Sequence, residues 1–353
     1  MKKVKSKSSR DLLGRLSKRL LAIAFSILLV FLLAYIAFQV NPWPGALLVR
    51  AIFNHSDKAV LTRLEKYTPT TPITVLSDQP YEAGDKNALL DVYIPQTAEQ
   101  GSQLLPVVIW THGGAWVSGD KTNDAPYFKS IAAHNLVVVS LNYSLAPEKS
   151  SPTQTLELNA AHAYVAANAK RFRVDPNKIF LAGDSAGAQL SSQMAALITN
   201  PDYAQEVGVR PALAPQQLAG VILFCGIYQL EGLTEAAPSL PRIISWADDR
   251  VVWAFSGSPD KSGPLIRQLS PYYHVTGSFP PTFISGGNGD PLTDHQSKPL
   301  AGRLTALGVP VTSLFYPADH QPSLAHEYQF NLDTADGQRA LDDILEFVRQ
   351  RDQ

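Results

Sequence analysis

The chain has 353 residues, of which 45% are hydrophobic and 17% are charged, a composition that supports a large buried core and excludes a disordered protein. Its formal net charge is −1, but lysines and arginines crowd the first twenty residues, so the remainder is mildly acidic. The single cysteine, Cys225, excludes a disulfide within the chain and a zinc site built from several thiolates.

A long apolar stretch follows the basic N-terminus. Residues 20–40 carry no charge, and about twenty residues in a helix span a hydrocarbon core of about 30 Å. The alternative is a cleaved signal peptide, but the apolar run is longer than an ordinary signal core, and residues 39–42 make a poor cleavage site. We therefore expect a transmembrane anchor. The basic residues before it are Lys2, Lys3, Lys5, Lys7, Arg10, Arg15, Lys18 and Arg19.

This basic tail, residues 1–19, directly precedes the anchor, which favours a topology signal over a nucleic-acid-binding tail. Basic flanks stay in the cytoplasm, so the chain after Val40 is expected to face outward. The sequence thus predicts a single-pass protein of the plasma (inner) membrane with a cytoplasmic N-terminus and a periplasmic or extracellular domain. We expect a connector at 41–75, short helical or extended over 46–70, and one domain at 76–353.

Strands and helices alternate from about residue 72, which predicts a mostly parallel sheet with helices on both faces. The expected strands are 90–94, 106–110, 136–141, 178–182, 220–224, 282–285 and 310–315. The expected helices are 153–171, 186–198, 296–306 and 335–349. Residues 226–280 interrupt this rhythm with several prolines and a helical segment near 242–254, and we interpret them as an insertion that caps the site.

The segment Gly183-Asp184-Ser185-Ala186-Gly187 fits the motif G-x-S-x-G. It follows a predicted strand and opens a predicted helix, the context in which this motif raises a nucleophilic serine above a sheet. The flanking glycines permit close approach of strand and helix. Ser185 is therefore the expected nucleophile.

A second glycine-containing loop, His112-Gly113-Gly114-Ala115-Trp116, follows the strand that ends near Thr111. Backbone N–H groups in such a loop stabilise the negative charge that develops on a carbonyl oxygen during acyl transfer, and each contributes about 3 kcal/mol. A plain glycine turn is the simpler interpretation, but the downstream serine motif favours an oxyanion hole. The expected donors are Gly113, Gly114 and Ala186.

A serine nucleophile needs a histidine base and a carboxylate that orients it, in the chain order Ser, Asp, His for this arrangement. Asp290 follows the predicted strand 282–285 and is preferred over Asp294, which is placed to cap the next helix. After the last strand, His326 is preferred over His320 as the base. The remaining candidates lie on predicted helices and are expected to be structural or surface residues: His134, His162 and His295.

These motifs together resemble the hormone-sensitive-lipase-like esterases and the related feruloyl- and acetyl-esterase (BD-FAE-like) carboxylesterases of the α/β-hydrolase class. The resemblance covers about residues 80–350. The segments that carry it are Trp110–Lys121, Asn142–Glu148 (NYSLAPE, against N-Y-R-L-A-P-E), Val174–Ala188 and Asp290–Asp294 (DPLTD, against D-P-L-x-D). The first aspartate of the last motif is the family's triad acid, which supports Asp290, and the sequence His326-Glu-Tyr-Gln-Phe supports His326.

The resemblance implies an α/β-hydrolase fold and hydrolysis of a carboxylic ester through an acyl-enzyme, with no cofactor. It also implies short, medium or aryl acyl groups rather than long-chain triglycerides. Three departures stand out: Ala115 replaces a glycine, Ser144 replaces an arginine, and the loop before His326 is several residues longer. No metal-binding or dinucleotide motif competes. The rival functions are an amidase, formamidase or peptidase with the same triad, and a non-catalytic scaffold.

Overall fold

The computed structural model describes residues 7–100, 103–231, 233 and 242–352. The lysines before residue 7, and residues 232 and 234–241 of the expected insertion, lie outside the described residues. A single sheet of eight strands organises the domain, in the order β1-β2-β4-β3-β5-β6-β7-β8. The first three strands in this order pair antiparallel and the others parallel. The strands are β1 (Ile73–Pro80), β2 (Leu89–Pro95), β3 (Leu105–Thr111), β4 (Val137–Leu141), β5 (Val174–Asp184), β6 (Leu218–Phe224), β7 (Thr282–Gly286) and β8 (Val311–Phe315).

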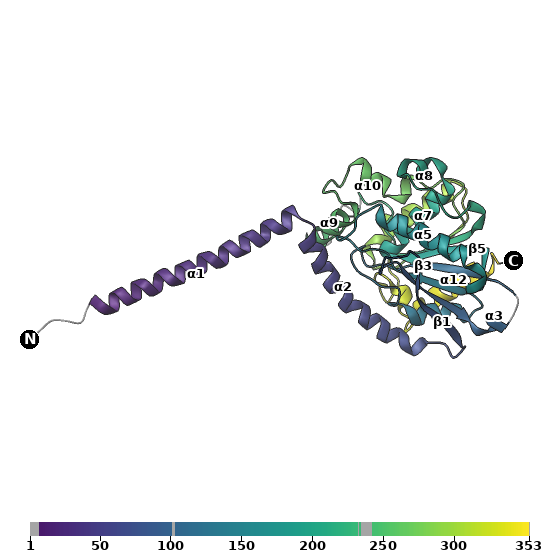
Figure 1. Ribbon diagram of the computed structural model, residues 1–353, viewed down its shortest axis with the longest axis horizontal. Coiled ribbons are helices and arrows are strands. Elements are labelled where there is room, and N and C mark those ends of the chain that lie inside the picture. Colours follow the sequence, from purple (N-terminus) through teal and green to yellow (C-terminus); the bar gives the residue numbers. More distant parts are fainter. Residues whose placement is uncertain (1–6, 101–102, 232, 234–241, 353) are drawn as a thin grey trace, which may run out of the picture.

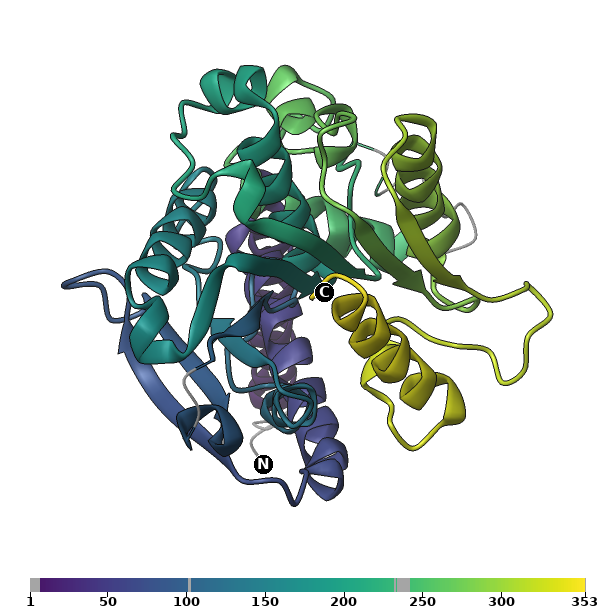
Figure 2. The same cartoon turned by 90° about the vertical axis from the view of Figure 1, so that its right-hand side faces the viewer.

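Helices cover both faces of this sheet, as Figure 2 shows. The side chains of strand β3 alternate between two apolar cores. Val107 and Ile109 belong to the core on one face, whereas Val108 and Trp110 belong to the core on the other. Both faces of each central strand are therefore buried, which explains their continuous apolar sequences. The helices are α1 (Lys7–Val40), α2 (Trp43–Leu64), α3 (Gln96–Gln100), α4 (Ala125–Ala132), α5 (Thr153–Ala167), α6 (Ala169–Phe172), α7 (Ser185–Thr199), α8 (Pro201–Val207), α9 (Arg242–Ser256), α10 (Pro264–Gln268), α11 (Lys298–Ala306) and α12 (Ala335–Arg349).

The sequence predicted a mostly parallel sheet with helices on both faces, and this prediction is confirmed. Each of the seven predicted strands overlaps an observed one. Strand β1 was not predicted, because it is an edge strand with a half-exposed burial pattern and an irregularity between Leu76 and Gln79. The predicted helix at 153–171 is divided into α5 and α6, and His134 lies in the turn after α4 rather than on a helix.

The first helix projects away from the rest of the chain (Figure 1). Within α1, the stretch Leu13–Val40 is long and apolar enough to cross a membrane by length and composition, and its most apolar window is not buried in the molecule. Figure 1 also shows α2 turning from the end of α1 to run along the domain. The short helical or extended connector expected for 46–70 is thus a helix of 22 residues.

Arg50 fixes the first half of α2 to the domain. Its guanidinium donates to the carbonyl oxygens of Val117 at 2.5 Å and Ala146 at 2.7 Å, and it binds both carboxylate oxygens of Glu148 at 2.6 and 2.7 Å. A planar guanidinium suits such forked contacts. Helix α2 also packs against α9 and α4. The connector is therefore part of the domain surface that surrounds the candidate site.

Candidate active site

Ser185 is the first residue of α7 and lies directly after β5. Its backbone has a φ of +49°, a left-handed conformation that a sharp strand-to-helix turn requires of a non-glycine residue. The flanking glycines are explained by packing. A Cβ atom on Gly187 would lie 2.0 Å from the carbonyl oxygen of Thr111, and one on Gly183 would lie 2.5 Å from the backbone of Gly187.

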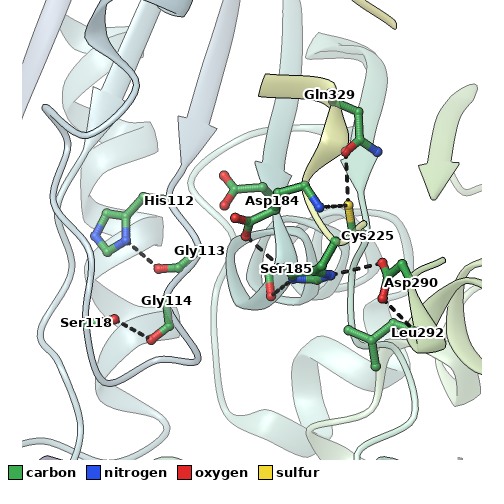
Figure 3. A network of polar contacts seen from close by, with 12 residues as sticks. His112, Gly113, Gly114, Ser118, Asp184, Ser185, Cys225, Asp290, Leu292 and Gln329 are labelled. Atoms are coloured by element: carbon green, nitrogen blue, oxygen red, sulfur yellow. Dashed lines mark hydrogen bonds and ion pairs between the residues drawn. The ribbon is translucent and has the colours of Figure 1, made fainter. Parts of the chain in front are cut away.

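The structure brings Ser185, Asp290 and His326 together. The Nε2 atom of His326 lies 3.0 Å from the Ser185 hydroxyl, and its Nδ1 atom lies 2.9 Å from a carboxylate oxygen of Asp290. Figure 3 shows Ser185 and Asp290 at this site. Asp290 is buried, and its other oxygen accepts a hydrogen bond from the backbone of Leu292 at 3.0 Å. An acceptor at Nδ1 fixes the tautomer that leaves Nε2 free to accept the serine proton.

The alternative acid and base lie elsewhere. The Nε2 atom of His320 lies 3.1 Å from the carboxylate of Asp336 on α12, and Asp294 is exposed and pairs with Lys298 at 2.6 Å. His295 is exposed as well. None of these side chains lines the cavity that contains Ser185 within the described part of the chain.

A clamp between two loops positions the long segment before His326. Asn288, in the loop after β7, accepts a hydrogen bond from the backbone of Leu324 at 2.9 Å and donates one to the carbonyl of His320 at 3.0 Å. A Cβ atom on Gly287 would lie 2.2 Å from the Leu324 carbonyl oxygen. These contacts explain how a longer loop still delivers His326 to the serine.

Cys225 makes hydrogen bonds to the segment that directly follows His326. It lies one residue after β6 and is fully buried. Its thiol donates to the Gln329 side chain at 3.2 Å, and its sulfur accepts from the backbone N–H of Glu327 at 3.3 Å (Figure 3). Among the described residues, Cys225, Asp290 and His326 bring potential metal-ligand atoms within 4.8 Å of one another, but all three side chains already make hydrogen bonds to the chain.

The glycine loop faces the serine. Gly114 has a φ of +99°, and Ala115 keeps a left-handed φ of +52° where the resembled family has glycine. The amide of Gly113 hydrogen-bonds the Asp184 carboxylate, and a Cβ atom there would lie 2.2 Å from that carboxylate. Ala186 is the second residue of α7, where a backbone N–H has no intrahelical acceptor. The amides of Gly114 and Ala186 are therefore the more open donors.

Aromatic and histidine side chains hold this loop in place. The ring of His112 stacks on Tyr143 at 4.4 Å, and its Nδ1 atom lies 2.8 Å from the Gly113 carbonyl oxygen. Burial lowers the pKa of His112, so the ring is neutral and donates from Nδ1. Trp116 donates to Gln189 on α7 at 2.9 Å and stacks on Phe255 at 4.6 Å. Ser144, where the resembled family has arginine, instead donates to Glu157 at 2.6 Å.

The site opens into a cavity of about 340 Å³ that α2 and α9 help to line. Its walls carry six carboxyl groups, which are Asp57, Asp124, Asp184, Asp248, Asp290 and Glu327. Burial raises the pKa of Asp57 and of Asp248 to about 6, and neighbouring carboxylates add to both shifts. Burial also raises the pKa of Asp124 and of Asp184, and the Glu327 carboxylate adds to both shifts.

Three of these carboxyls also change the pKa of His326. Burial opposes the charged imidazole, but Asp290, Glu327 and Asp184 outweigh it and raise the pKa of His326 to about 9. A carboxylate oxygen of Glu327 lies 3.6 Å from Nε2 of His326. The side chains of Asp57, Asp124 and Asp248 were not predicted from the sequence as site residues. Asp184 was part of a motif, but no role was predicted for it.

Comparisons with known proteins place the chain in a family. The BD-FAE family model matches residues 90–304, more than half of the chain. The chain is 32% identical to carboxylesterase NlhH of Mycobacterium tuberculosis over 64% of this chain and 66% of that protein. It is 28% identical to esterase LipC of the same organism over 63% of this chain and 53% of that protein. These matches therefore span about half to two thirds of each relative's length.

A solved structure of esterase B from Lactobacillus rhamnosis aligns with a TM-score of 0.75 and 23% identity, covering 88% of this chain and 95% of that one. A structure of an esterase from Pyrobaculum calidifontis aligns with a TM-score of 0.66 and 23% identity, covering 86% and 93%. At these identities the likeness establishes a shared fold.

Proposed function

The chain belongs to the BD-FAE family of α/β-hydrolase carboxylesterases, and from this membership we propose that it is a serine esterase that uses Ser185, Asp290 and His326. One observation carries the assignment of roles. His326 lies within hydrogen-bond distance of both the Ser185 hydroxyl and the Asp290 carboxylate, at 3.0 and 2.9 Å.

In the proposed reaction, Nε2 of His326 takes the hydroxyl proton while the Ser185 oxygen attacks the ester carbonyl. The amides of Gly114 and Ala186, with Gly113 beside them, stabilise the oxyanion. The intermediate expels the alcohol, which receives the proton from His326, and leaves an acyl-enzyme. Water then attacks the acyl-enzyme with His326 as base, so that the acid is released and Ser185 regains its proton. Asp290 stabilises the imidazolium throughout.

We propose short- or medium-chain or aryl acyl groups as substrates. A cavity of about 340 Å³ supports this choice, because it lies at the lower end of the size of small-molecule sites. An extended long-chain acyl group needs more enclosed apolar surface than such a cavity offers.

The test is a panel of aryl esters of increasing acyl length, with the matching anilides, run on the full chain in neutral detergent. We expect ester turnover that falls for long chains, little anilide turnover, and covalent labelling by a fluorophosphonate probe. Ser185→Ala should abolish both turnover and labelling. Wild-type rates in that variant would remove Ser185 from the mechanism, and anilide turnover that matches ester turnover would favour the amidase alternative.

We further propose that α1 anchors the protein in the plasma membrane with a cytoplasmic N-terminus. The support is the exposed apolar stretch Leu13–Val40 and the lysines and arginines that precede and begin it. C-terminal fusions test the orientation. We expect an active alkaline phosphatase fusion, which needs an exported location, and a dark green-fluorescent-protein fusion. The reverse pattern would overturn the orientation.

A further inference from the structure

The cavity beside Ser185 is more acidic than the proposed ester hydrolysis requires. Six carboxyl groups line it, and no lysine or arginine is among its described lining residues. The triad accounts for one of these groups, Asp290. Acyl transfer creates negative charge on the substrate oxygen, so additional carboxylates at the site oppose the transition state unless a positive charge offsets them.

Four of the carboxyls form one electrostatic group, which we call the acidic cluster: Asp57, Asp124, Asp184 and Glu327. They come from separate parts of the fold, namely α2, the residue before α4, the end of β5 and the loop after β8. Asp184, Glu327 and Asp57 each raise the pKa of Asp124, and Glu327 also raises the pKa of Asp57 and of Asp184, so the four groups lie close enough to repel one another.

Asp124 is the member without a partner. It is only 8% exposed and lines the cavity. Asp57 accepts a hydrogen bond from Asn123 at 2.8 Å and Asp184 accepts one from Trp110 at 2.7 Å, but the Asp124 side chain has no hydrogen bond or ion pair within the described chain. A buried carboxyl without a partner destabilises the fold, and such groups concentrate at functional sites.

We propose that this cavity accepts esters that carry an ammonium group, and that the acidic cluster supplies the countercharge for it. The inference rests on the proposed esterase function and adds its substrate class. Phe53 and Phe330 also line the cavity, and aromatic faces attract organic cations. A bound cation would satisfy Asp124 and reduce the repulsion between the cluster and the oxyanion. The ammonium therefore favours the transition state as well as binding.

The test compares each cationic ester with a neutral ester of the same shape, using the full chain in neutral detergent. The first pair, acetylcholine and dimethylbutyl acetate, differs in the charge of the alcohol part. The second pair, the ethyl esters of trimethylglycine and of tert-butylacetic acid, differs in the charge of the acyl group. Each kcat/KM is divided by the alkaline hydrolysis rate of that ester to remove intrinsic reactivity. We expect a corrected preference of about tenfold or more for the cation in one of the two pairs, which identifies the side of the ester. Tetramethylammonium should inhibit hydrolysis of the neutral members competitively.

Asp124→Asn and Asp57→Asn should each lower the cationic-to-neutral ratio and weaken tetramethylammonium inhibition. The second variant keeps the test valid if the first misfolds. Asp202→Asn, an exposed aspartate on α8, is the matched control and should leave the ratio unchanged. A ratio near one in the wild type, or a high ratio that survives both variants, would overturn this inference and leave the esterase proposal standing. No turnover of any ester would overturn both.

Discussion

Replacing Glu327 with glutamine is expected to shift the pH dependence of the reaction toward lower pH. In the proposed mechanism His326 acts as a base only when it is neutral, so kcat/KM should rise with pH as the imidazolium loses its proton. The carboxylates around His326 raise its pKa to about 9, which places the acid limb of the wild-type profile at alkaline pH. Removing one of those negative charges destabilises the imidazolium and lets it deprotonate at lower pH.

The magnitude follows from one distance. The Glu327 carboxylate lies 3.6 Å from Nε2 of His326, and the side chains of Glu327 and His326 are 34% and 37% exposed. Solvent therefore screens the pair strongly. With an effective dielectric constant of about 60, two unit charges at this distance interact by about 1.5 kcal/mol, or about one pKa unit. We expect the acid limb to shift downward by about one unit.

The assay is kcat/KM for a short aryl ester across neutral and alkaline pH, corrected for spontaneous hydrolysis. A neutral ester is used so that the substrate does not titrate. Glu65→Gln removes an exposed carboxylate outside the cavity and serves as the control. An acid limb in Glu327→Gln that stays at the wild-type position, or moves upward, would refute the assignment of Glu327 as a charge acting on the base.

Three further predictions concern the loops and α2. Gly113→Ala places a methyl group against the Asp184 carboxylate and should reduce kcat about 100-fold, whereas Gly302→Ala, where no atom lies within 4 Å, should leave kcat unchanged in the same assay. Arg50→Ala removes the forked contacts of α2 and should raise KM and destabilise the fold by about 1–3 kcal/mol in chemical denaturation; recovery by Arg50→Lys would contradict the need for the fork. Asp124→Asn should raise Tm at mildly alkaline pH by roughly 2–4 °C, and the gain should shrink at acidic pH, where the carboxyl is protonated in the unfolded chain as well as in the folded one. An equal gain at all pH values would exclude charge burial as its cause.

The sequence signal is strongest for the strands with both faces buried. Runs such as 106–110 and 220–224 are continuously apolar because helices cover both sides, so the pattern is strong. Strand β1 has no such signal, since most of its residues are partly or fully exposed. Helix α2 was underestimated because its apolar residues divide between those that contact the domain and those that remain exposed, among them Leu47, Leu48 and Ile52. A helix with two apolar faces lacks the periodicity that identifies a surface helix.

Some residues of the candidate site could likewise be predicted from the sequence, and others could not. Ser185, Asp290 and His326 were singled out because local motifs and chain order constrain them, and the structure brings all three within hydrogen-bond distance. The acidic cluster has no such motif. Asp57 and Asp124 are 67 positions apart and meet because α2 packs against the domain, where Asp57 also binds Asn123. Long-range docking of this kind leaves no local pattern in a sequence.

The acidic cluster also connects stability to function. Ionised carboxyls that lie close together in a cavity repel one another, and a carboxyl with a raised pKa lowers folding stability as pH rises through its titration range. The carboxyls in the cavity beside Ser185 are therefore an arrangement that destabilises the fold as pH rises. The proposed triad does not need the arrangement, because Asp290 is the carboxylate that hydrogen-bonds His326 at Nδ1. A ligand of opposite charge relieves this repulsion only while it is bound, which converts a cost in stability into selectivity for the substrate.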